Sequence, residues 1–347
     1  MSPGISLLAA RGVQDKWIML EKGDDKGISF FNQVFKKHSG FSQTVEKQYM
    51  QGVPKENSHS RITVTKNGDM LGHVYLTVDD GAQSIDVQDW SELVESVELY
   101  IGGTLIDKHT IEFMESAAVD LLATNQSKSS NGPHPGASSS SYFLPFRFWF
   151  CEHPMHALPI CAIAQEVELI IRWGANAASY NFECHSCMYF LDNEEREIMA
   201  SQEHNILITQ LQSVPASNER SQECVFSHPV KAIFTANTAV SSPYKQRNNR
   251  LKLQVNGEDL TPFKWAKPNF VDTQFYYHTE FVTSPDIFLY AFCMTTNLKQ
   301  PTGHLNFSRV ASFKIVSESL DLTDTIYALS LNILNVRGGV AAVRYAN

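Results

Sequence analysis

The chain has 347 residues, with 28 Lys and Arg against 37 Asp and Glu, so its formal net charge is -9. At roughly 150 residues per domain, this length suggests about two domains. Only 19% of the residues are charged while 43% are hydrophobic, against about 25% charged residues in typical soluble proteins. Two independent domains would need more charge to cover their wet surface, so part of the surface is expected to be buried against other subunits.

The same numbers exclude several classes of protein. The densest basic run is the short segment Lys245 to Arg250, and direct, sequence-specific nucleic-acid binding is therefore not expected. Met1 to Arg11 carries no positive region ahead of its apolar stretch, which makes it a poor signal peptide. No run of 18 apolar residues occurs, so we expect no membrane span.

Six cysteines stand at positions 151, 161, 184, 187, 224 and 293. They do not pair by spacing, and without a secretion signal a reduced state is expected. Cys184 and Cys187 form a lone CxxC motif. A structural zinc site would require a second pair of ligands at similar spacing, so buried thiols are the preferred interpretation.

Short runs of alternating apolar and polar residues predict half-buried strands along most of the chain. They lie at Ile62 to Val64, Leu76 to Val78, Val97 to Ile101, Val167 to Trp173, Leu251 to Val255 and Tyr327 to Ile333. Ile287 to Met294 is apolar on both faces, which is typical of a strand inside a sandwich or against a partner.

Two Asn-Gly pairs predict tight turns, because both residues tolerate the positive φ of a type I′ turn. Asn67-Gly68 separates the runs at Ile62 and Leu76, so it predicts a hairpin between them. Asn256-Gly257 follows the run that ends at Val255.

Helical signals are few. Ile111 to Ala123 has apolar residues at spacings of three and four, which predicts one amphipathic helix. Asp192 to Gln202 begins with an N-cap residue and acidic residues in its first turn, which predicts a second. The Ser/Pro/Asn stretch Ser213 to Arg220 follows, and we expect the joint between two halves of similar size between Asp192 and Arg220.

One segment, Asn125 to Ser141, is low in complexity and cannot bury apolar area, so it is expected to be a mobile surface loop. Its position between a helix and a strand indicates an insertion rather than a domain linker. Many short strands with two short helices predict an all-β architecture of two sandwiches.

Candidate sites of chemistry are weak. Cys151, His153 and His156 could together bind zinc, but a strand end followed by a turn at Pro154 explains them better. No His-x-His pair of the double-cupin type, nucleophile elbow or phosphate-binding loop occurs. The adjacent carboxylates Asp79-Asp80 and Glu194-Glu195 are expected to be solvated. We therefore predict no catalytic residues, no metal and no cofactor.

Two glycosylation sequons occur. Asn125 of Asn-Gln-Ser lies in the low-complexity loop and is the candidate glycosylation site. Asn306 of Asn-Phe-Ser lies in a strand-like run and is not expected to carry sugar.

Nine segments, in order, resemble the double jelly-roll major capsid proteins of large eukaryotic DNA viruses. In the first half these are Phe30 to His38, Ile62 to Val78, Val94 to Gly103 with Ile106 to His109, Leu144 to Cys151 with Ala157 to Ile160, and Tyr189 to Arg196. In the second half they are His228 to Lys231, Pro301 to Gly303 with Asn306 to Arg309, Tyr327 to Ser330, and Val336 to Tyr345. The resemblance covers roughly residues 28 to 347.

This resemblance implies two consecutive eight-stranded jelly-roll β-sandwiches with short helices. The expected divisions are an N-terminal arm (1–27), a first jelly roll (28–200) and a second jelly roll (201–347). The implied function is that of a structural major capsid protein, whose homotrimeric, pseudo-hexagonal capsomers tile an icosahedral virus shell. The implied location is the virion, after assembly inside the infected host cell.

The implied partners are further copies of the chain, neighbouring capsomers, and minor capsid and penton proteins, with an internal membrane beneath the shell. The chain is compact for this family, which leaves open a small virus, a virophage-like element or a secondary capsid protein. The alternative function is that of a two-domain β-sandwich carbohydrate-active or carbohydrate-binding protein, but the carboxylate cluster or exposed loop aromatics that it requires are not identifiable.

Overall fold

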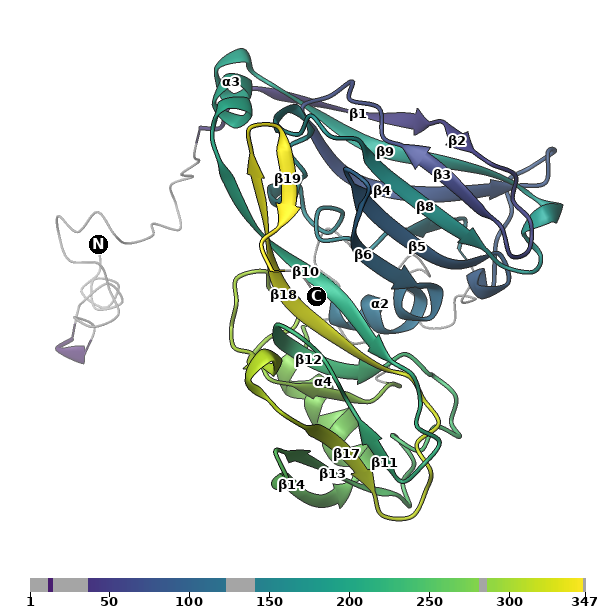
Figure 1. Cartoon of the computed structure of the whole chain (residues 1–347), viewed down its shortest axis with the longest axis vertical. Coiled ribbons are helices and arrows are strands. Elements are labelled where there is room, and N and C mark those ends of the chain that lie inside the picture. The colour runs from purple at the N-terminus through teal and green to yellow at the C-terminus, as the bar shows by residue number, and fades with distance from the viewer. Residues whose placement is uncertain (1–11, 15–36, 123–140, 281–285, 346–347) are drawn as a thin grey trace, which may run out of the picture. The chain divides into compact units, whose positions relative to one another are not determined.

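The computed structural model describes residues 12–14, 37–122, 141–280 and 286–345 (Figure 1). The chain divides into two units, Met1–Gly40 and Phe41–Asn347, and the description below concerns the second. Most of the expected N-terminal arm and opening strand (30–38), like nearly all of the low-complexity loop, lies outside the described residues.

The first half of this unit is a sandwich of two antiparallel sheets. Sheet 1a has four strands in the order β1 (Phe41–Gln48), β9 (Asn181–Leu191), β4 (Met70–Asp79) and β7 (Phe143–Pro145). Sheet 1b has five strands in the order β2 (Met50–Gln51), β3 (His59–Thr63), β8 (Val167–Trp173), β5 (Val94–Ile101) and β6 (Thr104–Thr110).

The second half is another sandwich. Sheet 2a follows the order β10 (His204–Val214), β18 (Ile326–Arg337), β12 (Pro229–Thr235) and β15 (Leu289–Ala291), with β16 (Leu305–Asn306) beside β12 and β19 (Val340–Val343) beside β18. Sheet 2b follows the order β11 (Ser221–Glu223), β17 (Phe313–Ser317), β13 (Arg250–Val255) and β14 (Glu258–Trp265).

The two sandwiches share one strand order. When β2, β16 and β19 are set aside, eight strands remain in each, and counting them along the chain gives sheets ordered 1-8-3-6 and 2-7-4-5 in both halves. This interleaving of early and late strands is the jelly roll, so the predicted fold class is confirmed. The predicted eight strands are the shared framework, while the described residues form nine strands in the first sandwich and ten in the second.

Both sandwiches also carry a helical segment at the same place in the strand order. After β6, the π-helical turn η3 (Phe113–Ala117) continues into α2 (Ala118–Leu121). After β14, the π-helical turn η7 (Pro268–Asp272) continues into α4 (Thr273–His278). The helix predicted from Ile111 is thus confirmed up to Leu121, with a π-helical turn in its middle.

The remaining short helices are single turns in the loops. They are η2 (Trp90–Glu92), η4 (Pro154–His156), η5 (Ile160–Ala162), η6 (Ala177–Ser179) and η8 (Phe307–Arg309). Within the described ranges, no helix combines the length and the apolar character needed to cross a membrane.

The two Asn-Gly pairs have different outcomes. The hairpin predicted at Asn67-Gly68 is wrong, because β3 pairs with β8 in sheet 1b whereas β4 pairs with β9 in sheet 1a. Here the chain crosses from one sheet to the other, and the backbone N–H of Asp69 donates to the carbonyl of Tyr189 at 2.9 Å. At Asn256-Gly257 the prediction is confirmed, since φ values of 51° and 86° join β13 to β14.

The second predicted helix is confirmed as α3 (Asn193–Ser201), and it connects the two sandwiches. The Asp192 carboxylate caps it by accepting from the backbone N–H of Asn193 at 2.8 Å. Arg196 ties the helix to the first sandwich through Asp69, with an Nε to Oδ1 distance of 2.9 Å. Strand β10 begins almost at once after α3, so Ser213, in the stretch read as a joint, is a strand residue.

Two hydrophobic cores fill the sandwiches, and one of them crosses the junction. The second sandwich has its own core, which includes Ile233, Phe288 and Ile315. The larger core fills the first sandwich and continues into Phe234 and Tyr327 of sheet 2a. Phe146, Phe148, Trp149 and Phe150 are buried in this core, whereas Tyr142 and Phe143, at the start of the same aromatic segment, are 57% and 39% exposed.

The C-terminal hairpin of β18 and β19 packs against the first sandwich through its tip, and we call this contact the clasp. In Figure 1, β18 and β19 run alongside β10 toward α3. At the hairpin tip, the backbone N–H of Ala164 donates to the carbonyl of Gly339 at 2.7 Å, and the N–H of Ala341 donates to Oε1 of Gln165 at 2.7 Å. Gly339 has a φ of +82°, and a Cβ at this position would lie 2.9 Å from the Cβ of Ala164. Only glycine fits this contact without strain.

Candidate functional site: the junction and the outer sheet faces

Sheet 2a is packed on both of its faces. Its inner face lies in the core of the second sandwich, and its outer face packs against the first sandwich. Phe234 of β12 pairs with Tyr327 of β18, and their rings stack with centroids 5.9 Å apart. Phe113 of η3 covers this pair, with its centroid 5.8 Å from that of Phe234. The Tyr327 hydroxyl donates to Oε2 of Glu112 at 3.2 Å and lies 3.1 Å from Oγ1 of Thr110. Burial raises the pKa of Tyr327 to about 12.

A second line of contacts fixes the register of β10 against β6. Nε2 of Gln210 donates to the carbonyl of Ile106 at 2.5 Å, and the backbone N–H of Leu211 donates to Oδ1 of Asp107 at 3.0 Å. The other oxygen of Asp107 lies 2.9 Å from Nε2 of the buried His109. Because these groups are buried, their hydrogen bonds make a shifted docking of the two sandwiches costly.

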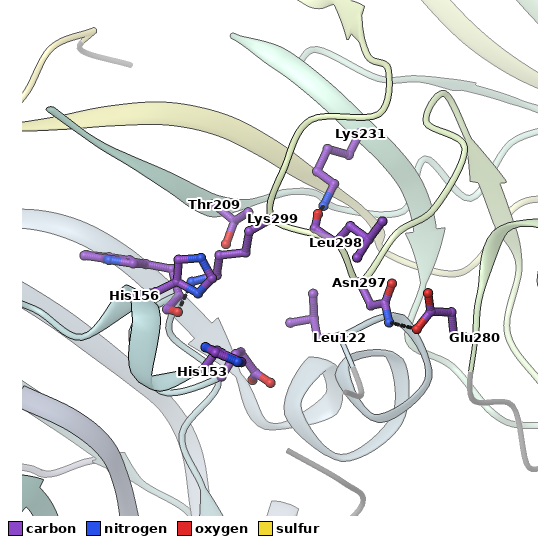
Figure 2. A pocket seen from close by; sticks show the side chains of 11 residues that line it. Leu122, His153, His156, Thr209, Lys231, Glu280, Asn297, Leu298 and Lys299 are labelled. Carbon is purple, nitrogen blue, oxygen red and sulfur yellow. Dashed lines mark hydrogen bonds between the residues drawn. The ribbon is translucent and has the colours of Figure 1, made fainter. Parts of the chain in front are cut away.

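A pocket of about 350 Å³ lies between the two sandwiches. Figure 2 shows it between His153, His156 and Leu122 of the first sandwich and Thr209, Lys231, Glu280 and residues 297–299 of the second. Nζ of Lys231, a residue that is only 2% exposed, donates to the carbonyls of Thr296 and Leu298 at 2.7 and 2.9 Å. Burial lowers its pKa. Lys231 thus holds the loop that bounds the pocket.

Lys299 extends from the second sandwich to the first. Its ammonium group donates to the carbonyl of Trp149 in the first sandwich, and burial lowers its pKa to about 7. Both lysines therefore satisfy backbone carbonyls at the junction, which gives the pocket a structural role.

The zinc candidates Cys151, His153 and His156 lie in the turns that follow β7, beyond the strand end at Pro145 where they were expected. Nδ1 of His153 accepts the backbone N–H of Met155 at 3.0 Å, which caps η4, and the two imidazole centroids are 5.7 Å apart. Burial lowers the pKa of His156 to about 4 and raises that of the Cys151 thiol. Among the residues that the structure describes, no group of three or more His, Cys, Asp or Glu side chains is placed to hold a metal ion.

The CxxC cysteines lie on opposite faces of β9. Cys184 packs in the main core, while Cys187 packs with Met70 and Tyr189 on the other side. Burial raises the pKa of both thiols, to about 12 for Cys184. All six cysteines are free, and this pair is not arranged to share a ligand.

The adjacent carboxylates have local roles. Asp79 and Asp80 cap a turn by accepting backbone N–H groups of residues 81–83 at 2.7 to 2.8 Å. Glu194 and Glu195 occupy the first turn of α3. Asn125 lies outside the described residues, so its glycosylation stays a prediction, and Asn306 caps η8 by accepting from the N–H of Ser308 at 3.1 Å.

The outer face of sheet 1b is charged. Glu98 lies 3.2 Å from Nζ of Lys108 and 2.7 Å from Nε of Arg172. Arg61 and Glu168 form a further ion pair on the same face. A charged outer face of this kind is typical of a sheet face in contact with water.

The outer face of sheet 1a is aromatic instead. Tyr75 stacks on His185 across β4 and β9 with centroids 5.2 Å apart, and it meets Phe143 of β7 at 5.9 Å and His73 at 6.3 Å. We call these four residues the aromatic face. Beside them, Val45 of β1 is 51% exposed, and a hollow of about 380 Å³ lies over the same strands.

A second exposed apolar surface lies in the second sandwich, where β14 leads into α4. Trp265 of β14 and Tyr276 and Tyr277 of α4 are 44%, 79% and 72% exposed. The Arg250 guanidinium lies over the Trp265 ring at 4.1 Å from its centroid, a cation–π contact. We call this surface the β14–α4 corner.

The alternation of apolar and polar residues shows which residues of a strand face the core, but it does not show that an outward row is itself aromatic. The sequence signal for the aromatic face was the identity of two outward residues. Tyr75 stands next to the buried Leu76, and His185 next to the buried Cys184, at positions where a solvated outer face would carry charged residues. Sequence reasoning missed both surfaces for this reason.

Two jelly rolls in one chain, joined by a helix and packed edge to face, define a double jelly-roll protein. The family model "Major capsid protein N-terminus" matches residues 29–182, and the model "Large eukaryotic DNA virus major capsid protein" matches residues 195–342. The chain belongs to the major capsid proteins of large eukaryotic DNA viruses.

Individual relatives agree over the whole chain. The major capsid protein of Pyramimonas orientalis virus is 28% identical, and that of Paramecium bursaria Chlorella virus 1 is 24% identical, each with 100% of both chains covered. These alignments run over 402 and 445 positions, so the relatives carry additional residues, as expected for a compact member.

Solved structures show the same fold. The chain matches a quasi-atomic model of the PBCV-1 virus capsid with a TM-score of 0.75 at 21% identity, over 92% of this chain and 100% of that one. It matches the Faustovirus major capsid protein with a TM-score of 0.62 at 11% identity, over 90% and 93%. The role of the chain is structural, as part of the virion capsid.

Proposed function

We propose that the chain forms homotrimeric, pseudo-hexagonal capsomers that tile an icosahedral shell. The observation that carries this proposal is the repeated strand order of its two sandwiches. Three copies around a threefold axis place six lobes of one topology in a ring, and most homo-oligomers have closed symmetry of this general kind. Such a ring approximates a hexagon, which is a shape that tiles a surface.

The division of labour along the chain is part of the proposal. Residues 28–200 form the first lobe and residues 201–347 the second, while residues 1–27 form an arm. The ranges matched by the two family models, 29–182 and 195–342, support this division, as does the position of α3 between the sandwiches.

The proposed partners are other copies of the chain, neighbouring capsomers, and minor capsid and penton proteins, with an internal membrane beneath the shell. The chain is proposed to carry out no catalytic turnover and to make no sequence-specific contact with nucleic acid. Its net charge of -9 supports the last point, because a negative surface repels phosphate.

Light scattering on size-exclusion fractions tests the trimer. The expected mass is three times the 39.0 kDa of one chain, constant over a tenfold dilution, because obligate interfaces bury on the order of 2,000 Å² or more. Electron micrographs of the same fraction are expected to show six lobes around a threefold axis. A monomer or dimer that persists at high concentration contradicts the proposal.

A further inference from the structure

The contact between the two sandwiches of one chain has a counterpart that the described part of the chain leaves uncovered. Sheet 2a buries its outer face against the corner where β6 leads into η3 and α2. Sheet 1a occupies the same place in the strand order of the first sandwich, yet its outer face holds partly exposed aromatic side chains.

The two faces carry the same device at the same strands. In sheet 2a, Phe234 and Tyr327 are register partners on the third and eighth strands of the jelly roll and stack at 5.9 Å. In sheet 1a, Tyr75 and His185 are register partners on the third and eighth strands and stack at 5.2 Å. The first pair is covered by the corner of another sandwich, whereas none of the described residues outside sheet 1a covers the second pair in this way.

The two corners correspond as well. In each sandwich the fifth strand ends, two helical residues follow, and a five-residue π-helical turn continues into an α-helix. Counting from the strand ends, Leu121 and Leu122 correspond to Tyr276 and Tyr277. The two leucines belong to the core that crosses the junction, whereas the two tyrosines are exposed.

We propose that the β14–α4 corner of one copy covers the aromatic face of the next copy, repeating between chains the contact made within each chain. This inference rests on the proposed trimer and names the surfaces that close it. The contact is head-to-tail: each copy offers its aromatic face to one neighbour and its corner to the other, and three such contacts close a ring.

Charge favours this pairing over a contact between two first sandwiches. Residues 41–192 hold 8 Lys and Arg against 19 Asp and Glu, a net charge of -11. Residues 204–347 hold 13 against 10, a net charge of +3. A first sandwich therefore attracts the second sandwich of its neighbour and repels another first sandwich.

Two double variants test the assignment. The face variant carries Tyr75→Glu and Phe143→Glu, and the corner variant carries Tyr276→Glu and Tyr277→Glu. The control, Val225→Glu, places one such carboxylate on an exposed apolar residue in the loop between β11 and β12, outside both surfaces. Circular dichroism and cooperative unfolding establish that each variant is folded.

Each double variant is expected to be a monomer by light scattering, while the control is a trimer. An equimolar mixture of the two variants is expected to form a dimer of twice the chain mass. In that pair the intact corner of the face variant meets the intact face of the corner variant, and neither remaining surface can continue the ring. Should a variant with two Glu substitutions fail to fold, the variant with Ser at the same two positions is expected to raise the trimer dissociation constant at least tenfold.

Two results overturn the assignment while leaving the trimer in place: trimers of wild-type stability in either variant, or no dimer in the mixture. A wild-type chain that does not form a trimer counts against the proposed function itself. The two failures are therefore distinguishable in the same experiment.

Discussion

Lys231 and Lys299 place two cations where a protein interior usually has none. Among the residues that the structure describes, neither has a carboxylate within ion-pair distance, and both donate to backbone carbonyls. Burying an ammonium group disfavours its charged form, which is why the pKa of Lys299 falls to about 7. The sequence does not distinguish these lysines from exposed ones, because their burial depends on loops brought together only in the folded chain.

Replacement of Lys299 by Met is expected to change how stability depends on pH. Between about pH 7 and about pH 10.5, the unfolded chain holds a proton on Lys299 that the folded chain lacks. The free energy of unfolding of the wild type therefore rises with pH relative to Lys299→Met. The slope stays below about 1.4 kcal/mol per pH unit, because part of the side chain reaches solvent.

Urea unfolding of both proteins across this pH range measures the difference. Lys264→Met, at an exposed lysine of β14, serves as the matched control and is expected to show no such trend. A difference between the wild type and Lys299→Met that stays constant with pH contradicts the assignment.

At the level of the elements, local signals succeeded where local geometry decides. The Asp192 cap, the helix that follows it and the turn at Asn256-Gly257 are each set by a few neighbouring residues. The hairpin predicted at Asn67-Gly68 does not form, although this segment has the same two residues. The strands that flank it are drawn into opposite sheets by partners about 100 residues away, in β8 and β9, and no local pattern reports those partners.

The hairpin of β18 and β19 depends on one of its two adjacent glycines more than on the other. Gly338 and Gly339 both have positive φ, but a Cβ at Gly338 meets open space whereas one at Gly339 lies 2.9 Å from the Cβ of Ala164. Gly338→Ala is expected to cost about 1 kcal/mol for the left-handed backbone alone. Gly339→Ala is expected to cost that amount and to loosen the clasp in addition.

Hydrogen exchange at the Ala164 amide, which donates to Gly339, separates the two variants. The exchange rate is expected to rise at least tenfold in Gly339→Ala and to stay close to wild type in Gly338→Ala. Equal protection in both variants contradicts a clasp at this position.

For the whole molecule, the junction is what makes two sandwiches one folding unit. Phe113 lies in a core shared by both sandwiches, whereas Phe313 lies in the core of the second sandwich alone. Both rings are at most 1% exposed, so replacement of either by Ala is expected to cost about 3–5 kcal/mol. Their effects on cooperativity are expected to differ.

Scanning calorimetry tests this difference. Phe113→Ala is expected to split thermal unfolding into two transitions, since it removes a contact that couples the sandwiches. Phe313→Ala is expected to lower the temperature of unfolding of the second sandwich without loosening the junction. A single, merely shifted transition in Phe113→Ala contradicts this view of the junction.

Strand β10 also has a consequence for the order of events on the ribosome. Its main partner in sheet 2a, β18, is synthesised after every other strand of that sandwich except β19. The first sandwich is complete at β9, before β10 emerges, and Ile106 and Asp107 already present the acceptors for Gln210 and Leu211. Domains generally fold in the order of their synthesis. We therefore expect the finished first sandwich to hold β10 in register until β18 is synthesised, and so to act as a template for folding of the second sandwich.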